Sequence, residues 1–318
     1  MKRNNKLVII LVSLMLVTLI TAVYAQSSAN VSYKAGLKFF SHKKYREAIP
    51  HFDSAIETNG SFVKAYVFRG LSYYMLEDHN KAINDLNKAL QLDPENVTAL
   101  YGRGMAYLFT GKSQKAITDF SMVLKKQPEN SKSYVNRAIC YYRLNKMKKA
   151  VSDASKSISF NVKNPSPYFL RAACYWRQGL HKAAVLDLKR AVDLYPNGPN
   201  LQIMYYISKA HIGDTSTDQL KAFYEKNKKK ADVWPYPAIA MMLGKIEPVD
   251  CIKAAKKFKP LKLRGTIEQQ ANFYVGEFFF IHKNQEKADK YRKLAMDGEN
   301  KLFIIQSLVK LEYYDFKK

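Results

Sequence analysis

Three serine–lysine pairs have the Ser-x-x-Lys spacing with which a lysine amine can activate a serine hydroxyl for acyl transfer. They are Ser41 with Lys44, Ser61 with Lys64, and Ser307 with Lys310. The companion Ser-Asp-Asn and Lys-Thr-Gly motifs of such enzymes do not occur in the sequence. A chain with 52 Lys and Arg residues produces these pairs by chance. We therefore predict a protein that is not an enzyme.

Metal, phosphate and redox chemistry are equally unsupported by the sequence. None of the six histidines lies in an HExxH or similar metal spacing, and Gly102-x-Gly104 opens no phosphate loop. The three cysteines, Cys140, Cys174 and Cys251, form no CxxC pair. Cys140 and Cys174 occupy equivalent positions on successive helices about 10 Å apart, too far for a disulfide. We expect buried thiols and no cofactor.

Arginine and aspartate recur with a fixed step, and such ordered charges could form either a functional ladder or a structural ion pair. The step is the same in both columns, and each Asp follows its Arg at a constant separation. Since stacking of equivalent units alone requires such a repeated pair, we interpret it as structural. The columns are Arg69, Arg103, Arg137 and Arg171, and Asp85, Asp119, Asp153 and Asp187.

Further columns keep the same 34-residue period, which is typical of stacked helix hairpins. They consist of Tyr73, Tyr107, Tyr141 and Tyr175; Ala82, Ala116, Ala150 and Ala184; and Pro94, Pro128 and Pro196. In the unit 63–96 we expect helices at about 65–76 and 80–92. Val162 replaces the proline of the third of these units, so we expect its link to the next unit to be looser or more helical.

This pattern of small, aromatic and proline positions resembles the tetratricopeptide repeat family. The resemblance implies an all-α fold, a right-handed α-solenoid whose concave face is built by the first helix of each repeat and binds peptides or proteins. It covers five repeats, at 29–62, 63–96, 97–130, 131–164 and 165–198. The first lacks the Arg and Asp columns, as suits a terminal cap.

After residue 198 the period blurs into a divergent helical region, 199–318. We expect a degenerate helix pair, then a break at Trp234-Pro235-Tyr236-Pro237, one hairpin near 269–300, and a closing amphipathic helix at 302–314. This arrangement resembles exported bacterial proteins of the NlpI lipoprotein group, although no lipobox cysteine is present. The resemblance implies an envelope adaptor, often dimeric, that brings proteases and cell-wall hydrolases together.

The segment 1–25 has the anatomy of a secretory signal: Lys2, Arg3 and Lys6, an apolar stretch, and Val23-Tyr24-Ala25 before the cleavage point. The alternative is an inner-membrane anchor formed by residues 7–23. We expect an exported protein, periplasmic or secreted.

The formal charge of +25 favours anionic partners, and export makes nucleic acid an unsuitable one. The alternative to a protein-binding function is therefore binding of an anionic glycopolymer or lipid surface through lysine-rich faces.

Mapping the family's groove positions onto the repeats gives an aromatic trough edged with cations, suited to a segment with apolar and some acidic side chains. Tyr74, Tyr142 and Trp176 are the expected anchors. The alternative, that aromatic side chains only pack between helices, is expected for about half of them. The family's carboxylate clamp of Lys and Asn is absent. The predicted groove residues are Tyr33, Phe40, Tyr74, Tyr101, Phe109, Tyr142, Arg143, Phe169, Trp176 and Arg177.

Overall fold

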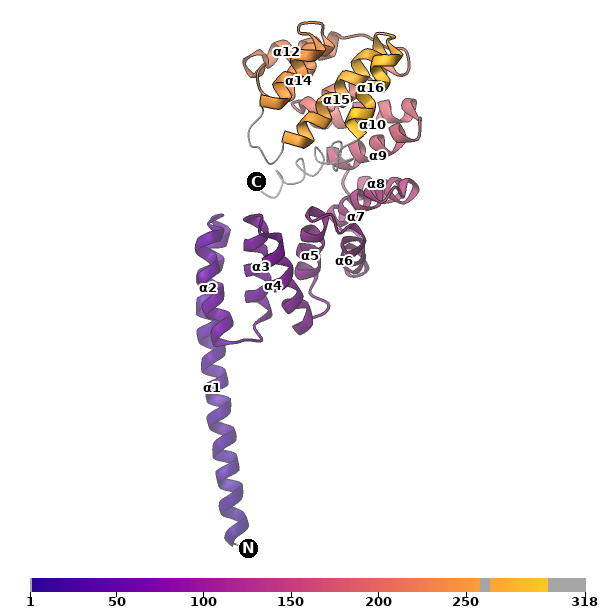
Figure 1. Ribbon diagram of the computed structural model, residues 1–318. Coiled ribbons are helices and arrows are strands. Elements are labelled where there is room, and N and C mark those ends of the chain that lie inside the picture. The colour runs from indigo at the N-terminus through magenta and orange to yellow at the C-terminus, as the bar shows by residue number, and fades with distance from the viewer. Residues whose placement is uncertain (1, 258–263, 297–318) are drawn as a thin grey trace. The chain divides into compact units, whose positions relative to one another are not determined.

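The described residues, 2–257 and 264–296 of a computed structural model, form helices joined by short turns, with no strand among them (Figure 1). The chain divides into two compact units, Met1–Glu129 and Asn130–Lys318. The first unit contains α1 (Lys2–Ser41), α2 (Tyr45–Thr58), α3 (Val63–Met75), α4 (His79–Leu92), α5 (Val97–Phe109) and α6 (Ser113–Lys126). The second begins with α7 (Ser131–Arg143), α8 (Met147–Phe160), α9 (Pro165–Arg177), α10 (His181–Leu194) and α11 (Pro199–Ala210). The predicted all-α solenoid of helix hairpins is confirmed.

Each hairpin consists of a first helix, here called A, and a second helix, called B, and the turn between them repeats the same backbone geometry. One residue per turn has a positive φ, at Lys43, Glu77, Gly111, Asn145, Gly179 and Gly213, each one repeat period after the last. In every case the next backbone N–H bonds to a carbonyl five positions earlier, at 2.8–3.0 Å. This bond closes a Schellman motif, which satisfies the end of the A helix and reverses the chain. In four of the six turns the acceptor belongs to the tyrosine column.

The seam between A and B helices depends on a small residue facing a larger one. A Cβ added at Gly70 would come 2.9 Å from Leu86, and one added at Gly104 would come 2.9 Å from Phe120. In the next hairpin Ala138 stands at the glycine position, and the facing position holds Ala154 instead of a large side chain. The two positions therefore share a limited volume.

Asparagine caps link the hairpins. Asn96, Asn130 and Asn164 each accept a backbone N–H of the following A helix at 2.9–3.0 Å. The expectation of a looser or more helical link at Val162 is wrong. The B helix α8 ends at Phe160, one repeat period after the end of α6, because the same cap follows it.

In the first unit, α1 is continuous through the predicted leader and the first A helix. The large apolar side chains that the structure describes between Leu11 and Leu19, and at Val23 and Tyr24, are more than half exposed. In contrast, Ala29 is fully buried and the Gln26 side chain bonds to Asn59. Packing against α2 therefore starts directly after the predicted cleavage point at Ala25. Among the described residues, no helix combines the length and apolar character that a membrane span requires.

In the second unit the backbone period extends further than the side-chain columns. α11 starts one repeat period after α9, and its turn at Gly213 is in register, although Tyr205 and Lys221 replace the Arg and Asp of the columns. The region then departs from the period with α12 (Asp218–Lys226), a 3-10 turn (Lys228–Lys230), α13 (Tyr236–Met242) and α14 (Pro248–Lys257). α13 begins within the predicted break, at Tyr236, because Pro237 occupies the first turn of the helix, where no N–H bond is lost.

The last described hairpin consists of α15 (Arg264–Ile281) and α16 (Gln285–Met296). Tyr274 and Gln270 of α15 donate to Asn200 of α11 at 3.0 and 3.2 Å. The indole of Trp234, which lies between the 3-10 turn and α13, donates to Gln270 at 2.8 Å. Tyr274 is one of the largest fully buried side chains. The predicted closing helix at 302–314 lies outside the described residues, as do residues 297–300 of the predicted hairpin.

Candidate functional site

The arginine and aspartate columns form one bidentate ion pair in each hairpin. Arg69 places Nε and Nη2 at 2.7 and 2.6 Å from the two oxygens of Asp85. The same fork recurs from Arg103 to Asp119, from Arg137 to Asp153 and from Arg171 to Asp187, at 2.7–2.9 Å. The aspartates are about 10% exposed or less. This confirms the structural interpretation, because each pair joins an A helix to its own B helix.

The remaining guanidinium nitrogen reaches the preceding hairpin. Nη1 of Arg69 donates to Asp53 at 2.7 Å, that of Arg103 to Asn87 at 2.8 Å, and that of Arg171 to Ser155 at 2.9 Å. Each of these arginines thus joins three helices. Hydrogen bonds to Asp85 and Asp53 outweigh burial and raise the pKa of Arg69.

The charge of the A helices is one-sided. α3, α5, α7, α9 and α11 contain no Asp or Glu at all, and neither does α1. The column arginines are neutralised by aspartates on the B helices. Lys64, Lys132 and Arg177, at predicted groove positions, are exposed on the same helices. We call the side of each unit built by these helices the A-helix face. These helices contribute only positive charge to it.

In the first unit, most predicted groove residues are partly accessible. Tyr33, Phe40, Tyr101 and Phe109 are of intermediate exposure. Tyr74 is only 4% exposed, since its ring packs 5.7 Å from Phe109 and 5.6 Å from His79. Tyr74 is therefore covered in this conformation, unlike the open anchor that the sequence led us to expect.

In the second unit, Tyr142 is 3% and Phe169 2% exposed, so these two predicted contact residues are also core residues here. The guanidinium of Arg177 lies 5.1 Å from the centre of the Tyr142 ring and covers it. Burial raises the pKa of Tyr142 to about 12. Arg177 is exposed, while Arg143 and Trp176 are of intermediate exposure, and burial lowers the pKa of Arg143. The accessible part of this face is therefore mainly cationic.

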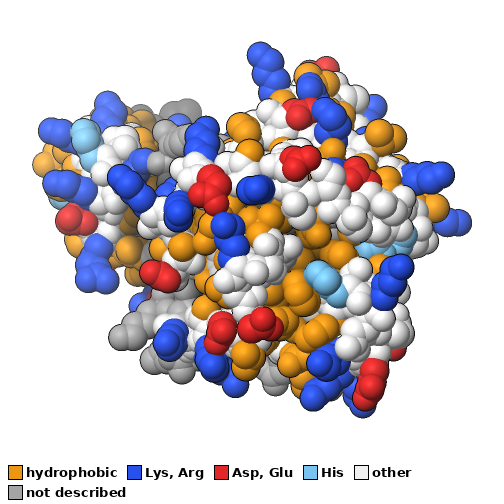
Figure 2. Space-filling model, turned by 90° about the horizontal axis from the view of Figure 1, so that it is seen from above, with side chains coloured by type: hydrophobic (Ala, Val, Ile, Leu, Met, Phe, Trp, Pro, Cys, Tyr) orange, Lys and Arg blue, Asp and Glu red, His pale blue; other side chains and the backbone are white. Residues whose placement is uncertain are grey.

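Viewed from above, one exposed area of hydrophobic side chains is bordered by Lys, Arg, Asp, Glu and His side chains (Figure 2). Charges of both signs therefore lie beside this area.

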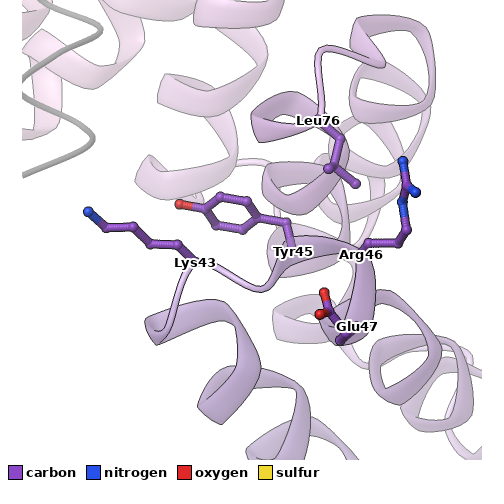
Figure 3. Close-up of a pocket in the computed structure, with 5 residues that line it drawn as sticks. All are labelled: Lys43, Tyr45, Arg46, Glu47 and Leu76. Atoms are coloured by element: carbon purple, nitrogen blue, oxygen red, sulfur yellow. The ribbon is translucent and has the colours of Figure 1, made fainter.

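An open hollow beside the first turn is lined by Lys43, Tyr45, Arg46, Glu47 and Leu76. Lys43 and Arg46 extend in different directions (Figure 3). Because the charges do not converge on one point, this hollow is not a preformed site for an ion.

Histidines on the A-helix side were missed by sequence reasoning. His79 and His181 begin B helices at equivalent positions three repeats apart, so the repeat period could have revealed them. His181 stacks on His211 with ring centres 4.6 Å apart, and Trp176 packs edge-on against both rings. His211 follows α11 at the position that Arg177 holds in the hairpin before.

Comparison with protein-family models identifies three matching segments. Residues 70–111 match a model described as a TPR repeat, and residues 101–158 and 165–197 match models described as tetratricopeptide repeats. A comparison with curated protein sequences finds no match. The recognition of tetratricopeptide repeats from the sequence is thus confirmed.

Solved structures with the same fold include pilF of Pseudomonas aeruginosa, at 15% identity, with 69% of this chain and 98% of that one covered and a TM-score of 0.58. PilW, described as a widely conserved type IV pilus biogenesis factor, aligns at 16% identity over 68% of this chain and 97% of its own, with a TM-score of 0.57. MamA of Desulfovibrio magneticus RS-1 aligns at 16% identity over 52% and 94%, with a TM-score of 0.51. At these identities the similarity demonstrates the fold alone.

Proposed function

Because the chain carries tetratricopeptide repeats, we propose that it is a non-enzymatic scaffold whose A-helix face binds a segment of a partner protein. Repeats of this family are general protein-interaction modules. The described residues contain no group of three or more His, Cys, Asp or Glu side chains placed to hold a metal ion.

The absence of acidic residues from α1, α3, α5, α7, α9 and α11 is the observation that carries the proposal. In the first unit this face has the partly accessible ring of Tyr101 and the exposed Lys64, and in the second unit it has the exposed Arg177. Each face is therefore complementary to a segment that carries negative charge. The partner segment is therefore expected to combine apolar side chains with Asp or Glu. A segment rich in Lys or Arg would be repelled.

The signal-like sequence of residues 1–25 indicates where this function would take place. We propose that residues 1–25 direct export and that partners are envelope proteins such as hydrolases or proteases. The packing of α1 against α2 starts after residue 25, which is compatible with removal of the leader. PilW, which has the same fold, is described as a type IV pilus biogenesis factor. Dimer formation belongs to the same proposal.

The proposal is tested by selecting from a random 16-residue peptide library displayed on phage against the whole chain. We expect selected peptides to be enriched in Asp and Glu interspersed with aromatic or aliphatic residues. Reversing one charge on the face, by Arg177→Glu, should weaken their binding about tenfold, because attraction becomes repulsion at a partly dry contact.

Lys189→Glu is the matched control, since Lys189 is an exposed residue of the B helix α10, paired with Asp193 at 3.0 Å. Peptides without acidic enrichment, or equal weakening by both substitutions, would refute binding at the A-helix face. The alternative, adhesion of an anionic glycopolymer or lipid, predicts binding that falls steeply with salt and responds equally to either charge reversal.

A further inference from the structure

The α15–α16 hairpin closes against the end of the α9–α10 hairpin through aromatic and imidazole rings. Phe273 of α15 packs edge-on against Trp176, with ring centres 5.6 Å apart. Phe280 of the same helix stacks on His211 at 4.4 Å, and His211 stacks on His181 at 4.6 Å. A continuous row of rings therefore connects α10 to α15.

A fully buried carboxylate stands behind this row. Glu277 of α15 has no exposed surface, and its two oxygens accept from His211 Nε2 at 2.7 Å and from Arg292 Nε at 2.8 Å. Burial alone would raise the pKa of Glu277, but these hydrogen bonds outweigh it and the net pKa is lowered. Glu277 therefore stays ionised in mild acid and holds His211 in place.

Two polar atoms of the contact lack hydrogen-bond partners in the part of the chain that the structure describes. They are Trp176 Nε1 and His181 Nδ1, and both atoms are buried. Buried polar atoms without partners destabilise the arrangement that buries them. Closure is thus opposed by these atoms and favoured by the stacked rings and by the Glu277 bonds. Such a balance can be tipped by one additional charge.

We propose that this contact is a proton-operated latch, closed while His181 is neutral and released when His181 is protonated. The latch borders the A-helix face of the second unit through Trp176, so its release changes access to that end of the face. The latch is separate from the proposed partner binding and can be tested on the chain alone.

The groups facing His181 determine the sign of the effect. Trp176 packs against it from α9 and His211 from the end of α11; Glu277 of α15 acts on it through charge, and Arg292 of α16 is bonded to that carboxylate. Burial and then His211 lower the pKa of His181, against an opposing contribution from Glu277. Because the pKa of His181 is lowered in the closed state, His181 binds its proton more tightly in the open state. The latch is therefore stable above about pH 6.5 and weakens as pH falls below it.

Hydrogen exchange of the whole chain measures this release. Protection factors of α15 and α16, corrected for intrinsic exchange, are compared at pH 7.5 and 5.5, with α3 and α4 as internal reference. We expect a loss of up to about tenfold at pH 5.5, the ceiling for one histidine whose open state has a pKa near 6.5. In the variant His181→Phe, which keeps a ring at the stack, the loss should shrink to less than about twofold.

His79→Phe is the matched control, because His79 holds the same repeat position in the first unit and should leave the tenfold loss unchanged. Fluorescence of Trp176 in a Trp234→Phe background gives a second readout and should shift to the red on acidification only while His181 is present. An unchanged protection of α15 between the two pH values, or an equal loss in His181→Phe, would overturn the latch.

Discussion

The Arg171 fork can be tested by removing one charge and supplying another. Asp187→Asn removes the negative charge and one of the two acceptor oxygens of Arg171, which keeps one amide oxygen and the hydroxyl of Ser155 at 2.9 Å. The side chains of Asp187 and Arg171 are 9% and 22% exposed. Removing one partner of a fully buried pair costs about 3–5 kcal/mol, so for this partly exposed pair we expect a loss of about 2–3 kcal/mol in the free energy of unfolding.

A second substitution reproduces the arrangement of another repeat. Ser155→Asp gives Arg171 the carboxylate that Arg69 receives from Asp53. In the Asp187→Asn background it should restore about 1–2 kcal/mol, more than it adds to the unaltered chain, because hydrogen bonds to charged groups contribute about that amount. Asp193→Asn, which removes an exposed pair with Lys189, should cost about 0.5 kcal/mol or less.

Urea unfolding followed by helical circular dichroism gives these free energies, and hydrogen exchange of α9 and α10 reports them locally, since repeat arrays can unfold in parts. The reasoning is refuted if Asp187→Asn is no more harmful than Asp193→Asn, or if the two substitutions at 155 and 187 prove additive. Either result would mean that the repeated Arg–Asp pair orients the two helices of a hairpin but does not increase the free energy of unfolding.

Three further outcomes are expected. Glu77→Gly should stabilise by about 0.5–1 kcal/mol in urea unfolding, because Glu77 has a φ of 64°, whereas Gly111→Ala, at a φ of 75° with open space around it, should destabilise by about 1–2 kcal/mol. Gly104→Ala should cost about 1–3 kcal/mol because its Cβ would meet Phe120 at 2.9 Å, and the added change Phe120→Leu should recover part of that loss in thermal unfolding. The three thiols are buried with pKa values of about 12, so a disulfide reagent at pH 8 should label them only after denaturation; labelling of the folded chain would contradict this.

The periodic part of the fold was readable from the sequence because each repeated residue has a local task. The Tyr73 column marks the carbonyl that closes the turn, and the Arg69 column marks the fork. The asparagines before α5, α7 and α9 are the caps of those helices. After residue 198, where other residues stand at these positions, the sequence predicts only a degenerate helix pair, and α11 and α12 lie there. The turn at Gly213 keeps the period after the Arg and Asp columns have ended.

The candidate site was less predictable. The repeat register gives the side of the helix on which a residue lies, but it does not give the exposed fraction of the side chain. Tyr74 and Tyr142 occupy groove positions by register, yet neighbouring rings and the Arg177 guanidinium cover them. The latch was out of reach for another reason: it joins His181 to Glu277, which lie far apart in sequence on elements with different spacing. A single sequence contains no signal for such a contact.

The one-sided charge of the A helices also limits how the molecule can meet itself. Two copies presenting this face of the second unit to one another would bring Arg177 of each against the cations of the other, and α7 and α9 contain no carboxylate. Such an encounter is repulsive at any distance shorter than the screening length of the medium. Self-association would therefore have to use a different surface, and the A-helix face would stay accessible in the self-associated protein.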